Sequence, residues 1–158
     1  MFRFLFCCFP WNHKLYNVKP EEMKPFVPNF KECKVISVYD GDTITVAAFL
    51  NKDPQCYKFK VRLNGIDSPE MRGSSPNEKQ HAIQSRDALK EKIMDKIITL
   101  DISGLEKYGR VLATIYYNGE NVNEWLLQNK YAIPYDGGTK KRDPTWDNEC
   151  VSKDTNKV

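Results

Sequence analysis

The residue types that can do chemistry gather in the stretch VRLNGIDSPEMRG, residues 61 to 73. It contains Arg62, Asp67 and Glu70, and Pro69 stiffens the turn between the two acids because its ring fixes one backbone angle. A planar guanidinium matches a phosphate group, and a carboxylate can bind a cation or take a proton from water. The stretch therefore has the parts of a phosphodiester-cleaving site, whereas each charge alone is equally typical of a solvated surface.

An acidic turn, DGDT at residues 40 to 43, lies nearer the N-terminus between two predicted strands. In an antiparallel meander the ends of the first and third strands lie on the same side, so we expect Asp42 near Asp67. Two facing carboxylates repel unless a cation lies between them, and carboxylate and carbonyl oxygens suit Ca²⁺ or Mg²⁺. The alternative is that the segment only makes a turn, for which Asp and Gly are the usual residues.

A third polar segment, EKYGR at residues 106 to 110, precedes the last predicted strand. Gly109 permits a sharp bend, and Arg110 would supply a second cationic fork at the start of that strand. Tyr108 could cover a base or bond a phosphate oxygen. The segment is a weak signal when it is taken alone.

Strands must position these residues, and alternating apolar positions predict them over residues 34–39, 43–50 and 56–63. In the first strand, Ile36 and Val38 are expected to share one face. The third strand alternates most regularly, and Arg62 falls on its polar face, so we expect Arg62 outside the core and a fold that survives its replacement. The faces of this strand consist of Tyr57, Phe59, Val61 and Leu63 and, opposite them, Lys58, Lys60 and Arg62.

A capping pattern opens the next element. Ser75 as N-cap, Pro76 at the first helical position and Glu78 reaching back predict a helix to about Lys96. Five strands with a helix after the third predict an α+β, mainly β domain, namely a five-stranded OB-type barrel with two or three packed helices. The remaining predicted elements are strands over 98–103 and 109–117 and a helix over 122–129, which Asn121 and Glu124 frame at its start.

The barrel is expected to occupy residues 31–138, between an N-terminal extension, residues 1–30, and a polar, loosely held tail, residues 139–158. Residues 2–11 are apolar and aromatic, but the run is far shorter than the ~20 residues that span a membrane, and no clear signal peptide is present. Acylation of Cys7 and Cys8 would make this segment an anchor on a membrane surface, and the alternative is a sticky tail.

The composition narrows the classes of protein. The chain has 158 residues and a net charge of +3, which permits a polyanionic ligand without arguing for one. Its five cysteines are scattered without a CxxC pair, and only two histidines are present. This pattern disfavours a zinc site and a disulfide framework and favours a reducing, cytoplasmic location. We expect a monomer.

Taken in order, DGDT, RLNGIDSPE and KYGR resemble the staphylococcal nuclease (thermonuclease) family. The similarity runs from about residue 35 to residue 135 and so covers roughly two-thirds of the chain. The resemblance implies an OB-type barrel with packed helices. It also implies a Ca²⁺-dependent endonuclease that acts on DNA and/or RNA, single-stranded or loosened, and leaves 3′-phosphates.

Matched motif to motif, the resemblance implies metal ligands, catalytic groups and nucleotide contacts. Ser68 stands where the family has a threonine that contributes its backbone carbonyl, so the change keeps the ligand atom. Tyr135 is an approximate equivalent, because the chain reads YAIPYDGG where the type member has an AYVY-like pair. The implied site consists of the metal ligands Asp42, Asp67 and Ser68, the catalytic residues Arg62, Glu70 (general base) and Arg110, and the substrate-binding residues Lys107, Tyr108 and Tyr135.

Two other functions stay open at this point. One is a non-catalytic nucleic-acid-binding module, since staphylococcal-nuclease-like domains of multidomain RNA-binding proteins resemble this fold but commonly lack the metal and arginine set. The full set in this chain favours an enzyme. The other is a membrane-tethered scaffold that acts through its N-terminal segment.

Overall fold

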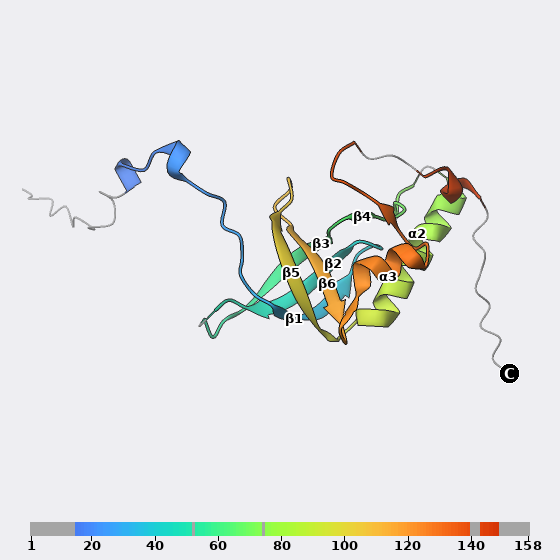
Figure 1. Ribbon diagram of the computed structural model, residues 1–158, viewed down its shortest axis with the longest axis horizontal. Coiled ribbons are helices and arrows are strands. Elements are labelled where there is room, and N and C mark those ends of the chain that lie inside the picture. The colour runs from blue at the N-terminus through green and yellow to red at the C-terminus, as the bar shows by residue number, and fades with distance from the viewer. Residues whose placement is uncertain (1–14, 52, 74, 140–142, 149–158) are drawn as a thin grey trace, which may run out of the picture.

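The structure, a computed structural model, describes residues 15–51, 53–73, 75–139 and 143–148. The segment 2–11, with Cys7 and Cys8, lies outside these residues, so its predicted membrane contact stays a prediction. Within the described ranges, no helix has the length and apolar character needed to cross a membrane. Residues 15–27 lead away from the barrel (Figure 1), and Phe30 packs on it by stacking against Phe59 at 4.8 Å between ring centroids.

The predicted five-stranded OB-type barrel is confirmed (Figure 1). Its strands follow the order β3-β2-β1-β5-β6, with antiparallel neighbours throughout. The sheet closes because β3 also pairs in parallel with β6, where residues 61–63 meet residues 111–113. Closure leaves few free strand edges and encloses one core. The strands are β1 Glu32–Val38, β2 Thr43–Phe49, β3 Cys56–Leu63, β5 Ile97–Leu105 and β6 Val111–Tyr117.

Both predicted helices form with the expected N-caps. Ser75 Oγ accepts a hydrogen bond from Glu78 N at 3.1 Å, and Asn121 Oδ1 accepts one from Glu124 N at 3.2 Å. The first helix ends earlier than predicted, because Asp95 takes a positive φ of 60° just beyond it. The helices are α2 Pro76–Ile93 and α3 Val122–Gln128; the short elements are η1 Pro20–Glu22, β4 Ile66–Asp67, β7 Glu120–Asn121, β8 Ile133–Pro134 and η2 Pro144–Asp147.

The alternation of β3 is as predicted, but the prediction for β1 is wrong. Cys33 and Val35 are the buried residues of β1, whereas Ile36 is 37% exposed. The pairing of β1 with β2 shifts register between Val35 and Ser37, and such a bulge changes which side chains face inward. Val38 packs partly against the core beyond the bulge, so Ile36 and Val38 do not share a face.

The expectation of a loosely held tail is wrong for the part of it that the structure describes, residues 143–148. Trp146 is only 4% exposed, and η2 packs against α2. Asn77 Nδ2 donates to Asp147 O at 2.6 Å, and His81 Nε2 lies 3.2 Å from Asn148 O. One large aromatic ring holds an otherwise polar segment, because a tryptophan buries far more apolar surface than its neighbours here.

We predict that Trp146→Ala lowers the free energy of unfolding by about 3 kcal/mol, because it removes a buried ring and leaves a cavity against α2. The measurement is urea denaturation followed by circular dichroism. Thr145→Ala, one position away and exposed, is the matched control and should change stability little. Equal urea midpoints for the two variants would mean that this segment is loosely held after all.

Candidate active site

The turns that carry the polar motifs meet at one end of the barrel. The turn between β1 and β2 is tied to the end of β3, since Leu63 N donates to Asp42 O at 2.8 Å. The turn between β5 and β6 closes through Glu106 N to Arg110 O at 2.9 Å, and Gly109 takes a φ of +79° there. That value is in the left-handed region that glycine adopts without strain. The local turn chemistry thus sets the positions of the polar side chains.

Every predicted site residue lines a single cleft of about 970 Å³ at this end of the barrel. The cleft therefore brings together motifs that lie far apart in the sequence, including Asp42 and Asp67, as expected for a meander. The predicted residues that line it are Asp42, Arg62, Asp67, Ser68, Glu70, Lys107, Tyr108, Arg110 and Tyr135.

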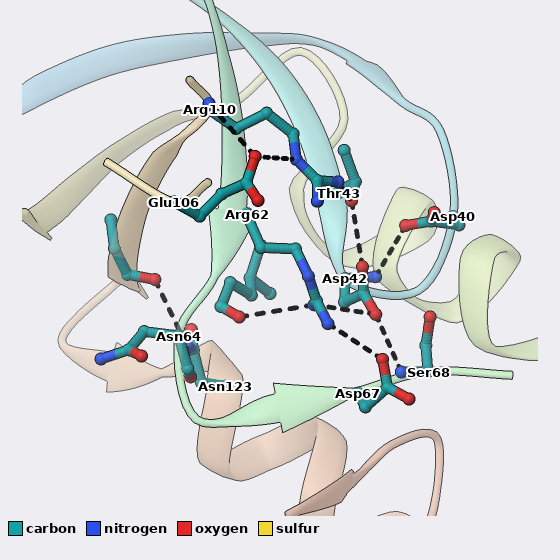
Figure 2. A network of polar contacts seen from close by, with 12 residues as sticks. Asp40, Asp42, Thr43, Arg62, Asn64, Asp67, Ser68, Glu106, Arg110 and Asn123 are labelled. Carbon is teal, nitrogen blue, oxygen red and sulfur yellow. Dashed lines mark hydrogen bonds and ion pairs between the residues drawn. The ribbon is translucent and has the colours of Figure 1, made fainter. Parts of the chain in front are cut away.

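Arg62 lies between two buried carboxylates (Figure 2). Its Nη1 is 2.8 Å from Asp42 Oδ2 and its Nη2 is 2.9 Å from Asp67 Oδ1. The side chains of Arg62, Asp42 and Asp67 are 12%, 7% and 2% exposed. Arg62 lies on the outer face of β3 and outside the hydrophobic core, as predicted, but its side chain is largely covered. The chain reverses at Gly65, whose φ is +77°, and β4 then brings Asp67 back against the guanidinium.

Asp42 is held by its own turn and by its neighbours. Its Oδ2 also accepts a hydrogen bond from Ser68 N at 2.8 Å, and its Oδ1 accepts one from Thr43 Oγ1 at 3.0 Å. Asp42 N donates in turn to Asp40 Oδ1 at 3.1 Å. The DGDT segment therefore makes a turn and also presents a carboxylate to the cleft, so the two interpretations of it are compatible.

Helix α2 packs closely against the turn between β1 and β2. A Cβ built on Gly41 would lie 2.8 Å from Ser68 Cβ and 2.9 Å from Ser85 Cβ, and closer still to Ser85 Oγ. Real Cβ atoms do not approach one another so closely, so only glycine fits between α2 and residue 68. The packing of α2 against this glycine therefore helps to hold the turn that carries Asp42.

Arg110 is anchored from two sides. Its Nε donates to Glu106 Oε1 at 2.9 Å, and its Nη1 donates to Thr43 Oγ1 at 3.2 Å. Because Thr43 also donates to Asp42, a continuous chain of polar contacts joins the two arginines (Figure 2). Glu106 and Thr43 were not among the predicted site residues. Their sequence signals are weak: Glu106 lies four residues before Arg110, and Thr43 is the last residue of the DGDT motif.

Burial and neighbouring charges shift the pKa values of three side chains in the cleft. Burial raises the pKa of Asp40 to about 7, and the negative charge of Asp42 adds to the shift. Burial works against ionisation of Glu106, yet hydrogen bonds from Arg110 bring its pKa below the ordinary value. Burial likewise disfavours the cation of Arg110, but contacts with Glu106 and the charges of Asp42 and Asp40 raise its pKa overall. A further cation near Asp40 and Asp42 would therefore be stabilised.

The donor atoms at this position suit a hard metal ion. In the described part of the chain, no three side chains of His, Cys, Asp or Glu cluster as a metal site. Two carboxylates, Asp42 and Asp67, do converge within the cleft, and Asp40 lines the cleft beside Asp42. Carboxylate, backbone carbonyl and water oxygens together form the usual ligand set of Ca²⁺ or Mg²⁺, so the residues fit such an ion.

The remaining predicted residues form the rim of the cleft. Glu70 is exposed there, and Tyr108 is 73% exposed with Lys107 Nζ 4.9 Å from its ring centroid. Tyr135 reaches the cleft because its backbone N donates to Gly65 O at 3.0 Å, and its hydroxyl donates to Gly138 O at 2.7 Å. Residues 136–139 also line the cleft, which the sequence did not predict; the only signal was the turn-forming pair Gly137 and Gly138.

The chain belongs to the family described as staphylococcal nuclease homologues, whose model matches residues 60–154, more than half of its length. It is 31% identical over 103 residues to a protein of Haemophilus influenzae named an uncharacterized endonuclease, covering 65% of this chain and 52% of that protein. It is 30% identical over 107 residues to a staphylococcal-like nuclease of Arabidopsis thaliana, covering 67% of this chain and 31% of that protein.

A third relative is the endonuclease Htp3 of Saprolegnia parasitica, which is 29% identical over 115 residues, covering 65% of this chain and 54% of that protein. The matched regions thus span about half the length of two of these relatives and less than a third of the plant nuclease.

We predict that Arg62→Ala lowers the free energy of unfolding by about 3 kcal/mol or more at neutral pH with a chelator present. The reason is that Asp42 and Asp67 would stay buried without their counter-charge. Lys60→Ala removes an exposed cation two residues earlier on the same strand and is the control. If both variants unfold at the same urea concentration, the guanidinium does not hold the two acids in place.

Proposed function

We propose that this cleft hydrolyses phosphodiester bonds in DNA and/or RNA, as a Ca²⁺-dependent endonuclease that leaves 3′-phosphates. The observation that carries the proposal is the polar network in which two arginines and two buried carboxylates share one cleft. Membership of the staphylococcal nuclease family and relatives named as endonucleases support it.

The two arginines are the groups that would bind the phosphate undergoing cleavage. Arg62 and Arg110 approach the cleft from β3 and from the start of β6, and each is already oriented by carboxylate or hydroxyl partners. Donors that are oriented before the substrate arrives need little reorganisation, so they stabilise the extra charge of the transition state more effectively than mobile side chains do.

Asp42 and Asp67, completed by the backbone carbonyl of Ser68, would hold the calcium ion. When bound, the ion would polarise a phosphoryl oxygen and offset negative charge. The fixed position of Asp42 in its turn, set by Ser68 N and Thr43 Oγ1, keeps one ligand in place whether or not a cation is present.

Glu70 is the proposed general base. It lies at the exposed rim of the cleft just after the buried Pro69, where it is accessible to water and its backbone is restrained. From this position its carboxylate would take a proton from the attacking water. Lys107, Tyr108 and Tyr135 line the same rim and would contact the nucleotides on either side of the cleaved bond.

A non-catalytic binding module is the rival proposal. Such a module needs cations and aromatic rings but has no use for two buried carboxylates set against an arginine, an arrangement that reduces its positive charge. The presence of Asp42 and Asp67 beside Arg62 therefore favours hydrolysis over binding alone.

The test of the metal is digestion of single-stranded DNA and RNA with Ca²⁺, with Mg²⁺ and with a chelator. We expect cleavage with Ca²⁺, none with the chelator, and products whose ends are 3′-phosphates. Asp42→Asn should need a higher Ca²⁺ concentration for half-maximal cleavage, because one anionic ligand becomes neutral. Undiminished cleavage in the chelator would remove the metal from the mechanism.

The roles of the arginines are tested by measuring the rate at which the protein cleaves a short oligonucleotide. Arg110→Ala should reduce kcat by roughly 100-fold or more, the scale of losing one oriented transition-state donor. Arg62→Lys keeps the charge beside Asp42 and Asp67 but loses the planar fork, so it should not restore full activity. Lys79→Ala, an exposed change on α2, is the control, and circular dichroism checks folding. Folded arginine variants that match the control in kcat would contradict the assignment.

A further inference from the structure

The outer face of β3 carries a row of cations that leads away from the cleft. Lys58, Lys60 and Arg62 alternate with the inward residues of the strand, and both lysines are exposed. Arg62 is the member of this row that enters the cleft. The other two have no part in the site described above, and we refer to Lys58 and Lys60 as the lysine row.

The neighbouring strand leaves this row uncovered. Across the β2–β3 pairing, Thr45 lies opposite Lys60 and Ala47 lies opposite Lys58. Both side chains are short and uncharged, so the outward positions of β2 beside the lysines neither cover them nor supply a carboxylate. Thr43, the next outward residue of β2, lies opposite Arg62 and hydrogen-bonds Arg110, so the face runs directly into the polar network.

The lysine row is not neutralised by nearby acids. Within the described residues, neither Lys58 nor Lys60 forms an ion pair. The nearest acid along this hairpin, Asp53, accepts hydrogen bonds from Tyr57 Oη at 2.7 Å and from Gln55 N at 2.8 Å. Two positive charges therefore stand free on a shallow surface that ends at the proposed catalytic arginines.

The spacing of the row matches a nucleic-acid backbone. A strand rises about 3.4 Å per residue, so successive outward side chains are about 7 Å apart, close to the length of one extended nucleotide. Proteins that bind single strands without sequence preference use cationic surfaces that follow the backbone in this way. Because Lys58 and Lys60 occupy successive outward positions before Arg62, three neighbouring phosphates would meet three cations in register.

We propose that Lys58 and Lys60 bind the two backbone phosphates next to the one held by Arg62, so that a single strand lies along the outer face of β3. This inference rests on the proposed function, because it takes the phosphate at Arg62 as the one that is cleaved. It names the substrate as a strand of several nucleotides, recognised through its phosphates and not through its bases.

A plain structural role would also account for lysines at these positions. The part of β3 that holds them pairs with β2 but not with β6, whose pairing begins at residue 61. Lysines on such a strand discourage pairing with other chains. That role depends on solubility alone and predicts no change in nucleic-acid affinity, so a binding measurement separates the two explanations.

The experiment compares Lys58→Gln/Lys60→Gln with Lys79→Gln/Lys90→Gln, which removes the same charge from exposed positions on α2. Binding of a fluorescent single-stranded DNA 12-mer is measured by anisotropy between 50 and 200 mM salt with a chelator present. We expect the slope of log affinity against log salt to fall by roughly 1.4 in the β3 variant, about 0.7 for each lost phosphate contact. The α2 control should keep the slope of the unmodified protein.

Cleavage in Ca²⁺ gives the second measurement. The β3 variant should lose about tenfold in kcat/KM on the 12-mer yet cleave a dinucleotide substrate at the unmodified rate, since the dinucleotide cannot reach the row. Lys58→Arg/Lys60→Arg, which keeps both charges, should retain the salt slope and the preference for the longer substrate.

The outcomes are distinguishable. A β3 variant that behaves like the α2 control, in binding and in cleavage, overturns the proposal even if the protein is a nuclease. A lysine-dependent salt slope in a protein that cleaves nothing in any metal supports the row as a binding surface and overturns the nuclease function. Loss of binding to phosphatidylserine vesicles with unchanged 12-mer binding would assign the lysines to a membrane and overturn the proposal.

Discussion

The end of the barrel that carries the cleft depends on the contacts of Arg62 with Asp42, at 2.8 Å, and with Asp67, at 2.9 Å. The three side chains come from the turn after β1, from β3 and from β4, so all three segments must meet for the pair of acids to be compensated. A buried carboxylate without a partner costs several kcal/mol. The reversal at Gly65 and the close packing of α2 on Gly41 can therefore be understood as the geometry that this charge pairing requires.

The same pairing bears on the chemistry. Buried ion pairs are seldom the most stable solution for a core, because desolvation offsets much of the attraction. An ion pair at the edge of a cleft is instead suited to binding a ligand. Its carboxylates can bind a cation, and its guanidinium can bind a phosphate, without a large movement of the backbone. Arg110 follows the same logic, held by Glu106 and Thr43 at the edge of the cleft, where an anionic ligand could compete for its donors.

How far the sequence predicts this molecule depends on whether a feature is local. The alternation of β3 and the caps at Ser75 and Asn121 are local and were predicted, and the antiparallel meander of the first three strands predicted that Asp42 lies near Asp67. The bulge in β1 was not predicted, because its register depends on its pairing with β2. The packing of Trp146 and the anchoring of Arg110 by Thr43 likewise depend on contacts between segments that are distant in the sequence. The spacing of residues does not predict such contacts.

Strand β3 divides two tasks between its two faces. Val61 and Leu63 face inward and are fully buried, so they contribute to the core, while the outward positions 58, 60 and 62 carry cations. A strand has a period of two residues, so the outward row can change without disturbing the packed row. Arg62 is the exception, since it belongs to the outward row but is covered by β4 and paired with Asp42. Stability and the proposed phosphate binding are therefore coupled at Arg62 and independent at Lys58 and Lys60.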